Sequence, residues 1–298
     1  MHKTVLLNET IEGLNLEGKS VILDGTFGGG GHSREICKRY PGIKIIALDQ
    51  DEGTLKKAEN RLKDLSCEIS FVNANFRDLD KVLRKKKVNE LDGIIFDLGL
   101  SSDQLENSGR GFSFLRDEPL LMTMKENPTP SDVTAQDVVN TWSEKNLADI
   151  IYGYGEERFS RGIARGIVEA RKGKKIETSL ELADIIQVSV PAAYRRGKRG
   201  KIHPATRTFQ ALRIAVNDEL GALTEGLERG WKALRVGGRI AVITFHSLED
   251  RIVKRFYKTK EKEGEGKMIN KKVIVATEEE IKNNPRARSG KLRILEKK

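Results

Sequence analysis

The first hundred residues alternate short apolar runs with segments of helical periodicity. We predict strands at 20–23, 43–48, 68–72 and 91–98. The segments at 33–40 and 54–65 carry apolar residues every three or four positions, as amphipathic helices do. The predicted strands show little apolar–polar alternation, which is typical of parallel strands buried on both faces. The pattern therefore predicts an α/β fold with a doubly wound, mostly parallel sheet and helices on both sides.

The alternation stops after Ser102. Residues 103–130 contain Gly, Asn, Ser and three prolines, which predict a loop. Three helices follow: one capped by Ser143, one over 156–172, and one that begins at the capping box Thr178-Ser-Leu-Glu181 and ends at Pro191. We predict an all-helical insertion at 110–203, which divides an α/β domain made of 1–109 and 204–298.

The α/β pattern resumes beyond the insertion. From Phe209 to Leu234 apolar residues recur every three or four positions, which predicts one long helix, or two in line, packed on the sheet. Further strands are expected at 239–245, 271–276 and 291–296. No apolar run approaches the roughly 18–20 residues of a membrane span, so we expect no membrane partner.

The net charge of the chain is confined to one segment. The sequence has 54 Lys and Arg against 44 Asp and Glu, a formal charge of +10. Residues 158–213 hold 14 of the basic residues and four of the acidic ones, so this segment carries the whole excess. Its densest part is Arg195–Lys201. Such a segment is typical of a surface that binds a polyanion, although a solvated loop would have the same composition. A smaller basic group at 286–293 could join that surface.

The cysteines and histidines indicate neither a disulfide framework nor a metal site. Cys37 and Cys67 form no CxxC motif, and we expect both to be reduced, as in a cytoplasmic protein. The four histidines lack the spacing of metal ligands, so no metal is predicted. The first residues do not resemble a signal peptide.

A glycine-rich segment between the first strand and the first helix is the strongest candidate site. Gly28–Gly31 would let the backbone approach a ligand, and the helix that follows offers free N–H groups to an anionic group. Asp49 ends the second strand, 21 residues after Gly28, at a spacing that suits a carboxylate binding ribose hydroxyls. A tight turn without a ligand is the alternative.

The residues around this loop favour S-adenosylmethionine over NAD. A dehydrogenase fingerprint needs glycine at position 33, where this chain has Ser33. Asp24, Asp49 and Asp97 all fall at strand ends on one edge of the predicted sheet. A pyrophosphate would meet like charge there, whereas the sulfonium and ammonium of S-adenosylmethionine would be favoured.

Eight sequence blocks from residue 2 to near the C-terminus are similar to the bacterial small-subunit ribosomal RNA cytosine-N4 methyltransferases, the RsmH or MraW family. The blocks are 2–9, 24–33, 97–102, 110–114, 153–159, 203–213, 245–251 and 284–289. The resemblance implies a Rossmann-like methyltransferase sheet interrupted by a helical insertion, here an RNA-recognition domain. It also implies methylation of N4 of a cytidine in the decoding centre of 16S ribosomal RNA, within the small ribosomal subunit. The oligomeric state stays open.

The same resemblance implies the residues that bind the methyl donor. They are Gly30, Gly31, His32, Asp49, Phe76, Asp97 and Gln104. The loop residues are expected to offer backbone N–H groups to the methionine end, Asp49 to accept from the ribose and Phe76 to pack on adenine. Without the resemblance, Phe76 would be an ordinary core aromatic and Gln104 a surface residue of the loop.

Asp97 is also the candidate catalytic residue. DNA amino-methyltransferases place an acidic or amide residue before Pro-Pro-aromatic at the end of the fourth strand; here Asp97 is present and Pro-Pro-aromatic is absent. Asp97 would accept a hydrogen bond or a proton from the target amine, or serve only the donor. No second acidic group is expected to share this role.

Other residues have open roles. Phe112 and Phe114 could stack on an unstacked base and Arg110 could hold a phosphate, or all three could anchor a loop. His246 follows the strand at 239–245 and could contact the base or a phosphate, or be structural.

Two other kinds of function are alternatives to an RNA methyltransferase. One is an NAD(P)-dependent oxidoreductase, against which Asp24 and Ser33 argue. The other is a non-enzymatic RNA-binding ribosome assembly factor, against which the intact donor motif argues.

Overall fold

The computed structural model describes residues 3–62, 65–195 and 203–298. Its contacts divide the chain into two compact units. The first, here called the sheet unit, comprises Met1–Ser101 and Leu220–Lys298. The second, the helical unit, comprises Ser102–Glu219. None of the helices in the described ranges is long and apolar enough to cross a membrane.

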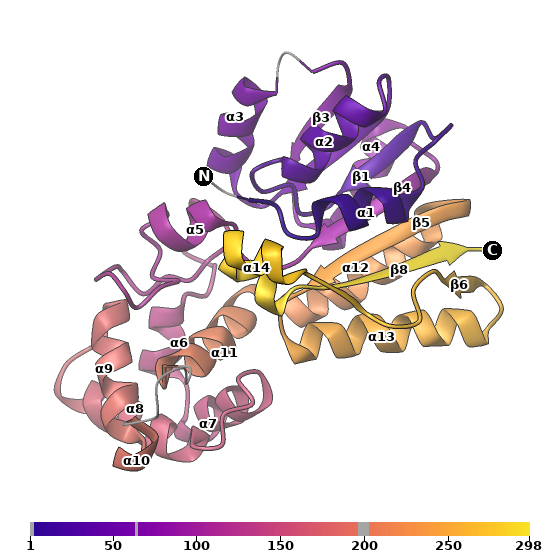
Figure 1. Cartoon of the computed structure of the whole chain (residues 1–298). Coiled ribbons are helices and arrows are strands. Elements are labelled where there is room, and N and C mark those ends of the chain that lie inside the picture. The colour runs from indigo at the N-terminus through magenta and orange to yellow at the C-terminus, as the bar shows by residue number, and fades with distance from the viewer. Residues whose placement is uncertain (1–2, 63–64, 196–202) are drawn as a thin grey trace. The chain divides into compact units, whose positions relative to one another are not determined.

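The sheet unit contains one sheet in the order β3-β2-β1-β4-β5-β8-β6, with β7 also paired to β8 (Figure 1). Strands β1 to β5 are parallel, and β8 runs antiparallel to β5, β6 and β7. The strands are β1 Val21–Asp24, β2 Lys44–Asp49, β3 Glu68–Asn73, β4 Leu91–Asp97, β5 Leu234–Thr244, β6 Gly266–Met268, β7 Ile274–Val275 and β8 Lys291–Lys297. The predicted doubly wound, mostly parallel sheet is confirmed.

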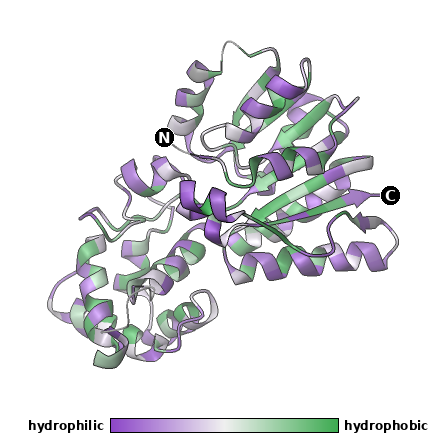
Figure 2. Cartoon of the chain, in the orientation of Figure 1, coloured by the Kyte–Doolittle hydropathy of each residue, from purple (hydrophilic) through white to green (hydrophobic). Residues whose placement is uncertain are grey.

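Adjacent residues of the central strands point into two different cores. Ile94 joins the core built with α4 (Leu79–Lys86), α12 (Glu219–Ala233) and α13 (Ser247–Lys262). Its neighbour Ile95 joins the core built with α1 (Leu7–Leu14) and α2 (Gly31–Arg39). The strands are therefore apolar throughout because both faces are covered. Figure 2 shows hydrophobic colour along the central strands and hydrophilic colour on the outer sides of the helices.

Among the described residues of the helical unit, the regular secondary structure is helical, apart from one isolated bridge between Pro119 and Thr178. Two of its caps were predicted: Ser143 accepts from the Asn146 N–H, and Thr178 forms a capping box with Glu181. The helices are α5 Ser102–Asn107, α6 Ala135–Thr141, α7 Glu144–Gly153, α8 Ser160–Gly173, α9 Ser179–Ser189, α10 Ala192–Arg195 and α11 Ala205–Asn217.

The boundaries of this unit differ from the predicted 110–203. The apolar periodicity from Phe209 to Leu234 belongs to two helices, because Asp218 adopts a left-handed conformation (φ 46°) between α11 and α12. Only α12 packs in the sheet core, and α11 belongs to the helical unit. At the other end, α5 forms where a loop was predicted. Apolar spacing shows that a helix is amphipathic, but not which core it joins.

Several elements escaped prediction, among them α1, α13 and α14 (Glu278–Asn283). The prediction of two reduced cysteines is also wrong, because Cys37 and Cys67 form a disulfide with their Cα atoms 5.4 Å apart. Cys37 lies in α2 and Cys67 just before β3. Their separation of 30 residues gives no sign in the sequence that the fold brings them together.

Candidate active site

Three carboxylates lie where parallel strands end at one edge of the sheet. Asp24 ends β1, Asp49 ends β2 and Asp97 ends β4. Strand β1 pairs with β2 on one side and with β4 on the other, so the chain reverses its winding direction between β1 and β4. Open α/β sheets bind their ligands beyond the strand ends at this reversal point. The topology thus places Asp24 and Asp97 at the expected binding crevice.

The glycine loop between β1 and α2 has a backbone that only glycine tolerates well. Gly28 and Gly30 have φ angles of +52° and +73°. A Cβ atom on Gly31 would lie 1.7 Å from Thr4 Oγ1, so a larger residue would collide. Asp49 holds this loop: its Oδ2 accepts from the Gly28 N–H at 2.8 Å, and its Oδ1 from the Asp51 N–H at 2.9 Å.

Asp24 is buried and bound to the start of α2. Its Oδ2 accepts from the Ser33 hydroxyl at 2.7 Å. Burial raises the pKa of Asp24 to about 6, against the opposing effect of the Ser33 and Thr26 hydrogen bonds. Ser33 thus serves a carboxylate at the position where a dehydrogenase fingerprint requires glycine. This arrangement argues against a pyrophosphate in the loop.

Asp97 has the most perturbed environment of these carboxylates. Its N–H donates to Thr26 Oγ1 at 2.6 Å, and its Oδ2 lies 3.8 Å from His32 Nδ1. Its Oδ1 is buried and accepts no hydrogen bond from any described residue. Burial, with smaller contributions from the negative charges of Asp24 and Glu249, raises the pKa of Asp97 to about 8. A buried carboxylate oxygen without a donor fits a ligand that brings positive charge or an N–H group.

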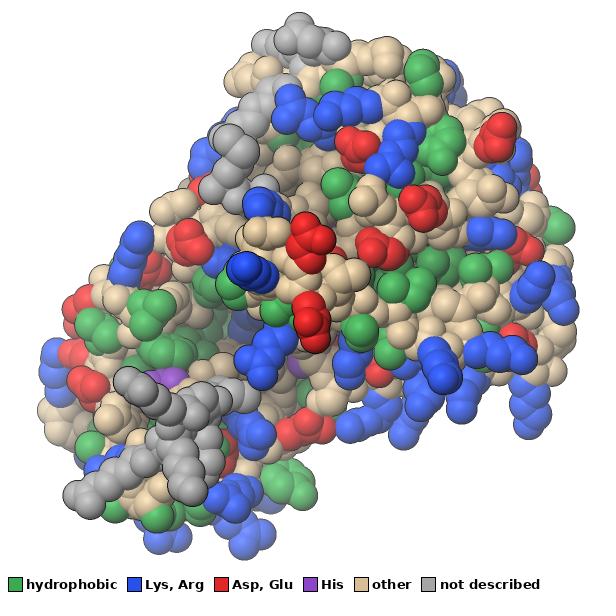
Figure 3. Space-filling view, in the orientation of Figure 1, with side chains coloured by type: hydrophobic (Ala, Val, Ile, Leu, Met, Phe, Trp, Pro, Cys, Tyr) green, Lys and Arg blue, Asp and Glu red, His purple; other side chains and the backbone are tan. Residues whose placement is uncertain are grey.

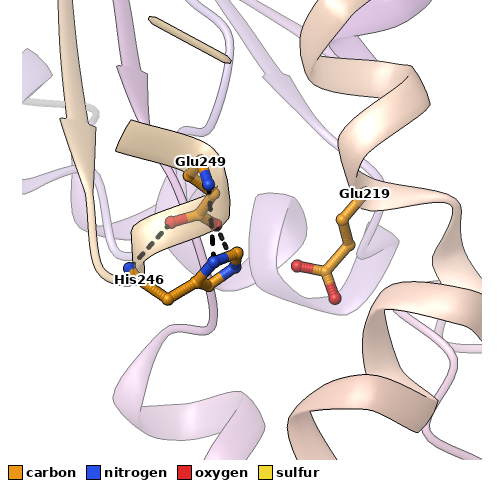
Figure 4. Close-up of side chains that lie close together, drawn as sticks. All are labelled: Glu219, His246 and Glu249. Carbon is orange, nitrogen blue, oxygen red and sulfur yellow. Dashed lines mark hydrogen bonds and ion pairs between the residues drawn. The ribbon is translucent and has the colours of Figure 1, made fainter. Parts of the chain in front are cut away.

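Glu249 and His246 lie at the same sheet edge, beyond β5. Figure 4 shows the His246 Nε2 facing the Glu249 carboxylate, at 3.1 Å from Oε1. Glu249 Oε2 accepts from the Phe245 and His246 N–H groups at 2.8 and 3.3 Å, and His246 Nδ1 accepts from the Glu249 N–H at 3.4 Å. This is a capping box at the N-terminus of α13.

Sequence reasoning did not single out Glu249 as an acidic neighbour of Asp97. The side chain of Glu249 is only 3% exposed, and its charge acts on Asp97. The available signal was the glutamate three residues after a capping position at the end of a strand. Glu219, also drawn in Figure 4, belongs to the helical unit, where it pairs with Arg213 at 2.7 Å.

The remaining donor-binding candidates lie in different surroundings. Phe76 follows β3 and is half-buried, with its ring 4.8 Å from that of Phe96. A Cβ atom on Gly226 would lie 2.5 Å from the Phe76 ring, so this ring also packs closely on α12. Gln104 is buried in α5, within the helical unit. The structure brings Gly30, Gly31, His32, Asp49 and Asp97 together at one edge of the sheet.

In the helical unit, Arg110 and Phe112 have structural surroundings. Arg110 is 5% exposed, and its Nη1 donates to the carbonyls of Thr123 and Met124 at 3.1 and 2.9 Å. Phe112 is buried beneath the Arg110 guanidinium. The interpretation of Arg110 as a phosphate ligand is therefore wrong, and the loop-anchor alternative holds for these two residues. Phe114 is half-buried, and the exposed His203 stacks on it at 4.6 Å.

Three cations of the basic segment 158–213 are paired with acids that lie outside the segment. Arg165 pairs with Glu144, Arg207 with Glu157 and Arg213 with Glu219, at 3.8, 4.0 and 2.7 Å. These acids lie outside the segment, so the formal charge of +10 overstates what the segment offers a polyanion. Most of its densest part, residues 196–201, lies outside the described residues.

The strand order and the loop resemble many nucleotide-binding proteins, but the carboxylates narrow the class. A ligand edge with three strand-end carboxylates and a buried Asp97 oxygen fits a cationic nucleotide without phosphate. Fold and site together define an S-adenosylmethionine-dependent methyltransferase. The MraW methylase family model matches residues 1–298, and the chain belongs to that family. The resemblance seen in the sequence blocks is confirmed.

Relatives of known name match over nearly the whole chain. The Ribosomal RNA small subunit methyltransferase H of Carboxydothermus hydrogenoformans is 49% identical, over 99% of this chain and 97% of its own length. That of Sulfurihydrogenibium sp. is 48% identical, over 98% of both chains. Among solved structures, a putative rRNA-methylase from Clostridium thermocellum aligns over the whole of both chains with a TM-score of 0.47 and 11% identity.

Proposed function

We propose that this chain transfers the methyl group of S-adenosylmethionine to N4 of a cytidine in the decoding centre of 16S ribosomal RNA. Two relatives 48–49% identical to the chain are named Ribosomal RNA small subunit methyltransferase H, which supports small-subunit ribosomal RNA as the substrate. The cytidine amine is inferred from Asp97. The single observation that carries this inference is its buried Oδ1, which has no donor among the described residues.

Donor binding is assigned to the sheet edge. Gly31 and His32 open α2 and would direct backbone N–H groups to the carboxylate of the methionine end. The Gly30 N–H already donates to the Phe27 carbonyl at 2.8 Å, so Gly30 would serve the site through its left-handed backbone instead. Asp49 would accept from ribose hydroxyls while it holds Gly28. Two further residues are proposed for the donor site: Phe76, which would pack against the adenine, and Gln104 of α5. When bound, S-adenosylmethionine supplies an electrophilic methyl group on a cationic sulfur, with a neutral thioether as leaving group.

Asp97 is proposed to act on the acceptor. Cytosine N4 is a weak nucleophile because its lone pair is delocalised into the ring. A carboxylate that accepts a hydrogen bond from this amine helps the nitrogen to rehybridise and takes up the proton that it loses. In the donor-free protein a pKa of about 8 leaves Asp97 largely protonated near neutral pH. Positive charge at the site favours its ionised form. We infer that donor binding ionises Asp97 and so prepares it to accept a hydrogen bond, and then the proton, from the amine.

The experiment is mass mapping of 16S ribosomal RNA after incubation of the protein, S-adenosylmethionine and unmodified small subunits. We expect one added methyl group on one cytidine of the decoding centre. Naked 16S RNA in parallel tests whether the assembled subunit is required. A methyl group on another base, or on a ring carbon, would contradict the proposal. Binding without methylation would favour the assembly-factor alternative.

A further inference from the structure

Helix α13 of the sheet unit carries a continuous basic face that the donor site does not use. Its apolar residues Leu248, Val253 and Tyr257 are buried, and the two last belong to the sheet core. Lys and Arg side chains gather along this helix in Figure 3. The exposed cations on it are Arg251, Lys254, Arg255, Lys258 and Lys262, here called the α13 basic stripe.

Three cations of the stripe lack the acidic partners that accompany other surface cations of the same unit. Lys56 pairs with Glu52 in α3 (Glu52–Arg61), and Arg84 pairs with Asp80 in α4. By contrast, no acidic residue occurs from 251 to 260. Within the described ranges, no acid pairs with Lys254, Arg255 or Lys258.

This arrangement opposes the stability of the helix. Like charges three or four residues apart on a helix repel each other by a few tenths of a kcal/mol for each pair. Arg251 and Arg255, Lys254 and Lys258, and Arg255 and Lys258 all have such spacings. Acids of the first turn could relieve the repulsion, but Glu249 is buried in the capping box and Asp250 pairs with Arg293 at 2.8 Å. Lys254, Arg255 and Lys258 thus concentrate positive charge, and no acid of the described residues pairs with them.

The helix that carries the stripe also starts at the sheet edge where β4 ends at Asp97. Helix α13 is capped by His246, directly after β5, and β5 pairs with β4 so that Ile243 lies opposite Asp97. From residue 251 to residue 262 the helix axis extends about 16 Å at 1.5 Å per residue. A nucleic-acid strand that places a base beside Asp97 has to pass the ends of β4 and β5, and its neighbouring phosphates come within reach of α13.

We propose that the α13 basic stripe binds the phosphate backbone of the RNA next to the target nucleotide. The identity of that RNA rests on the proposed function. An anionic membrane is the less favoured partner, because an interfacial helix needs apolar side chains that enter the lipid, and Val253 and Tyr257 are buried in the sheet core. Phosphate contacts position a strand without reading its sequence, so the stripe contributes affinity and orientation.

The test is the full-length triple variant Lys254→Gln/Arg255→Gln/Lys258→Gln. A matched control, Lys56→Gln/Lys81→Gln/Arg84→Gln, removes the same charge from cations that are paired with acids. Binding to unmodified small subunits is measured from low to high salt. Each lost phosphate contact lowers the slope of log K against log salt by about 0.7–0.9, so the stripe variant should lose about 2–3 and the control almost nothing.

Methylation kinetics and donor calorimetry complete the test. We expect the KM for the RNA substrate to rise roughly ten- to several-hundredfold in the stripe variant, with kcat and donor affinity unchanged. Equal salt slopes and KM values for the stripe and control variants would overturn the proposal. The proposal would also be overturned if the stripe variant lost binding to phosphatidylglycerol vesicles but kept its binding to RNA. If the wild-type protein methylates no cytidine but the slopes still differ, the proposed function fails and the RNA surface stands.

Discussion

Asp97 combines three properties that ordinary surface carboxylates lack. It ends a central strand, one of its oxygens is buried without a donor from the described residues, and Asp24 and Glu249 act on its charge. Together they make the neutral form stable until the site receives positive charge or an N–H donor. Such a carboxylate can interact with the cationic donor, and it can also accept a hydrogen bond or a proton from the acceptor amine. Experiments have to separate these two roles.

Replacing Asp97 with Asn keeps the size and one acceptor oxygen but removes the charge and the basicity. If Asp97 orients or deprotonates the amine, single-turnover methyl transfer should slow by roughly 10–1000-fold. Donor affinity should change much less. If instead turnover recovers at saturating S-adenosylmethionine, Asp97 serves the donor alone.

The raised pKa of Asp97 also predicts how donor binding depends on pH. A cationic donor binds the ionised carboxylate better, so its affinity should increase up to tenfold per pH unit as pH approaches about 8, and then level off. The donor's own ammonium group titrates in the same region. Asp97→Asn isolates the contribution of Asp97, because only the wild-type protein should show it. Calorimetric titrations with parallel pH profiles would contradict the assignment.

Stability without donor should follow the opposite trend. Because the folded pKa of Asp97 is higher than the unfolded one, the folded state holds more protons between pH 4 and pH 8. The free energy of unfolding should therefore fall as pH rises through this window. Thermal melts of the wild-type protein and Asp97→Asn should diverge with that sign, and a wild-type melting temperature that rises relative to the variant would contradict the assigned pKa.

Asp49 holds the glycine loop and is proposed to bind the donor ribose, and one substitution would remove both. Asp49→Ala should weaken donor binding by about 1–3 kcal/mol, the scale of lost charge-assisted hydrogen bonds. It also deletes the acceptor for the Gly28 N–H. Asp49→Asn retains one acceptor oxygen and should fall between wild type and Asp49→Ala in calorimetry. Asp51→Ala is the control, because it leaves the Asp51 N–H in place; unchanged affinity in Asp49→Ala would remove Asp49 from the site.

At the scale of elements, the site depends on how helices begin. Helix α2 starts within the glycine loop, and α13 starts with the capping box of His246 and Glu249. Histidine is not among the residues usually preferred at an N-cap. Its presence beside Glu249, at the sheet edge that carries Asp97, raises the question of whether it also contacts the substrate.

Two substitutions of His246 answer this question. His246→Ala should lower the free energy of unfolding by about 1 kcal/mol through loss of the cap, and His246→Ser should restore it, because serine caps well. If His246 is only structural, His246→Ser also restores methyl transfer. Stable His246→Ser protein with impaired transfer at saturating donor would assign a substrate contact to this side chain. Thr178→Ala, at the capping box of α9, controls for a purely structural loss.

At the scale of the whole molecule, the basic segment 158–213 is a further predicted RNA contact. The segment 158–213 still holds the formal charge excess, with its densest cations at 195–201. Changing Arg195, Arg196, Lys198 and Arg199 to Glu should reduce RNA binding and flatten its salt dependence, with donor binding intact. If RNA affinity survives this change in filter-binding assays, the segment is solvated surface, and the α13 basic stripe becomes the main phosphate contact.

The sequence by itself determined the class of fold and the position of the glycine loop. Parallel strands buried on both faces have to be apolar throughout, so the apolar runs at 43–48 and 91–98 predicted two of these strands. Gly28–Gly31 and Asp49 were also predictable, because a positive φ and a strand-end carboxylate leave local signals. Residues 2–289 carried the family resemblance, which the family model confirms.

Only the tertiary structure decided which distant residues share an environment. It joined Cys37 to Cys67, brought Glu249 close enough to act on Asp97, buried Arg110 under carbonyl oxygens and assigned α11 to the helical unit. It also showed acids paired with three cations of segment 158–213, and none with Lys254, Arg255 and Lys258 among the described residues. The physical reason is common to all: burial, pairing and Coulomb interactions depend on distance in space, whereas local patterns report only neighbours along the chain.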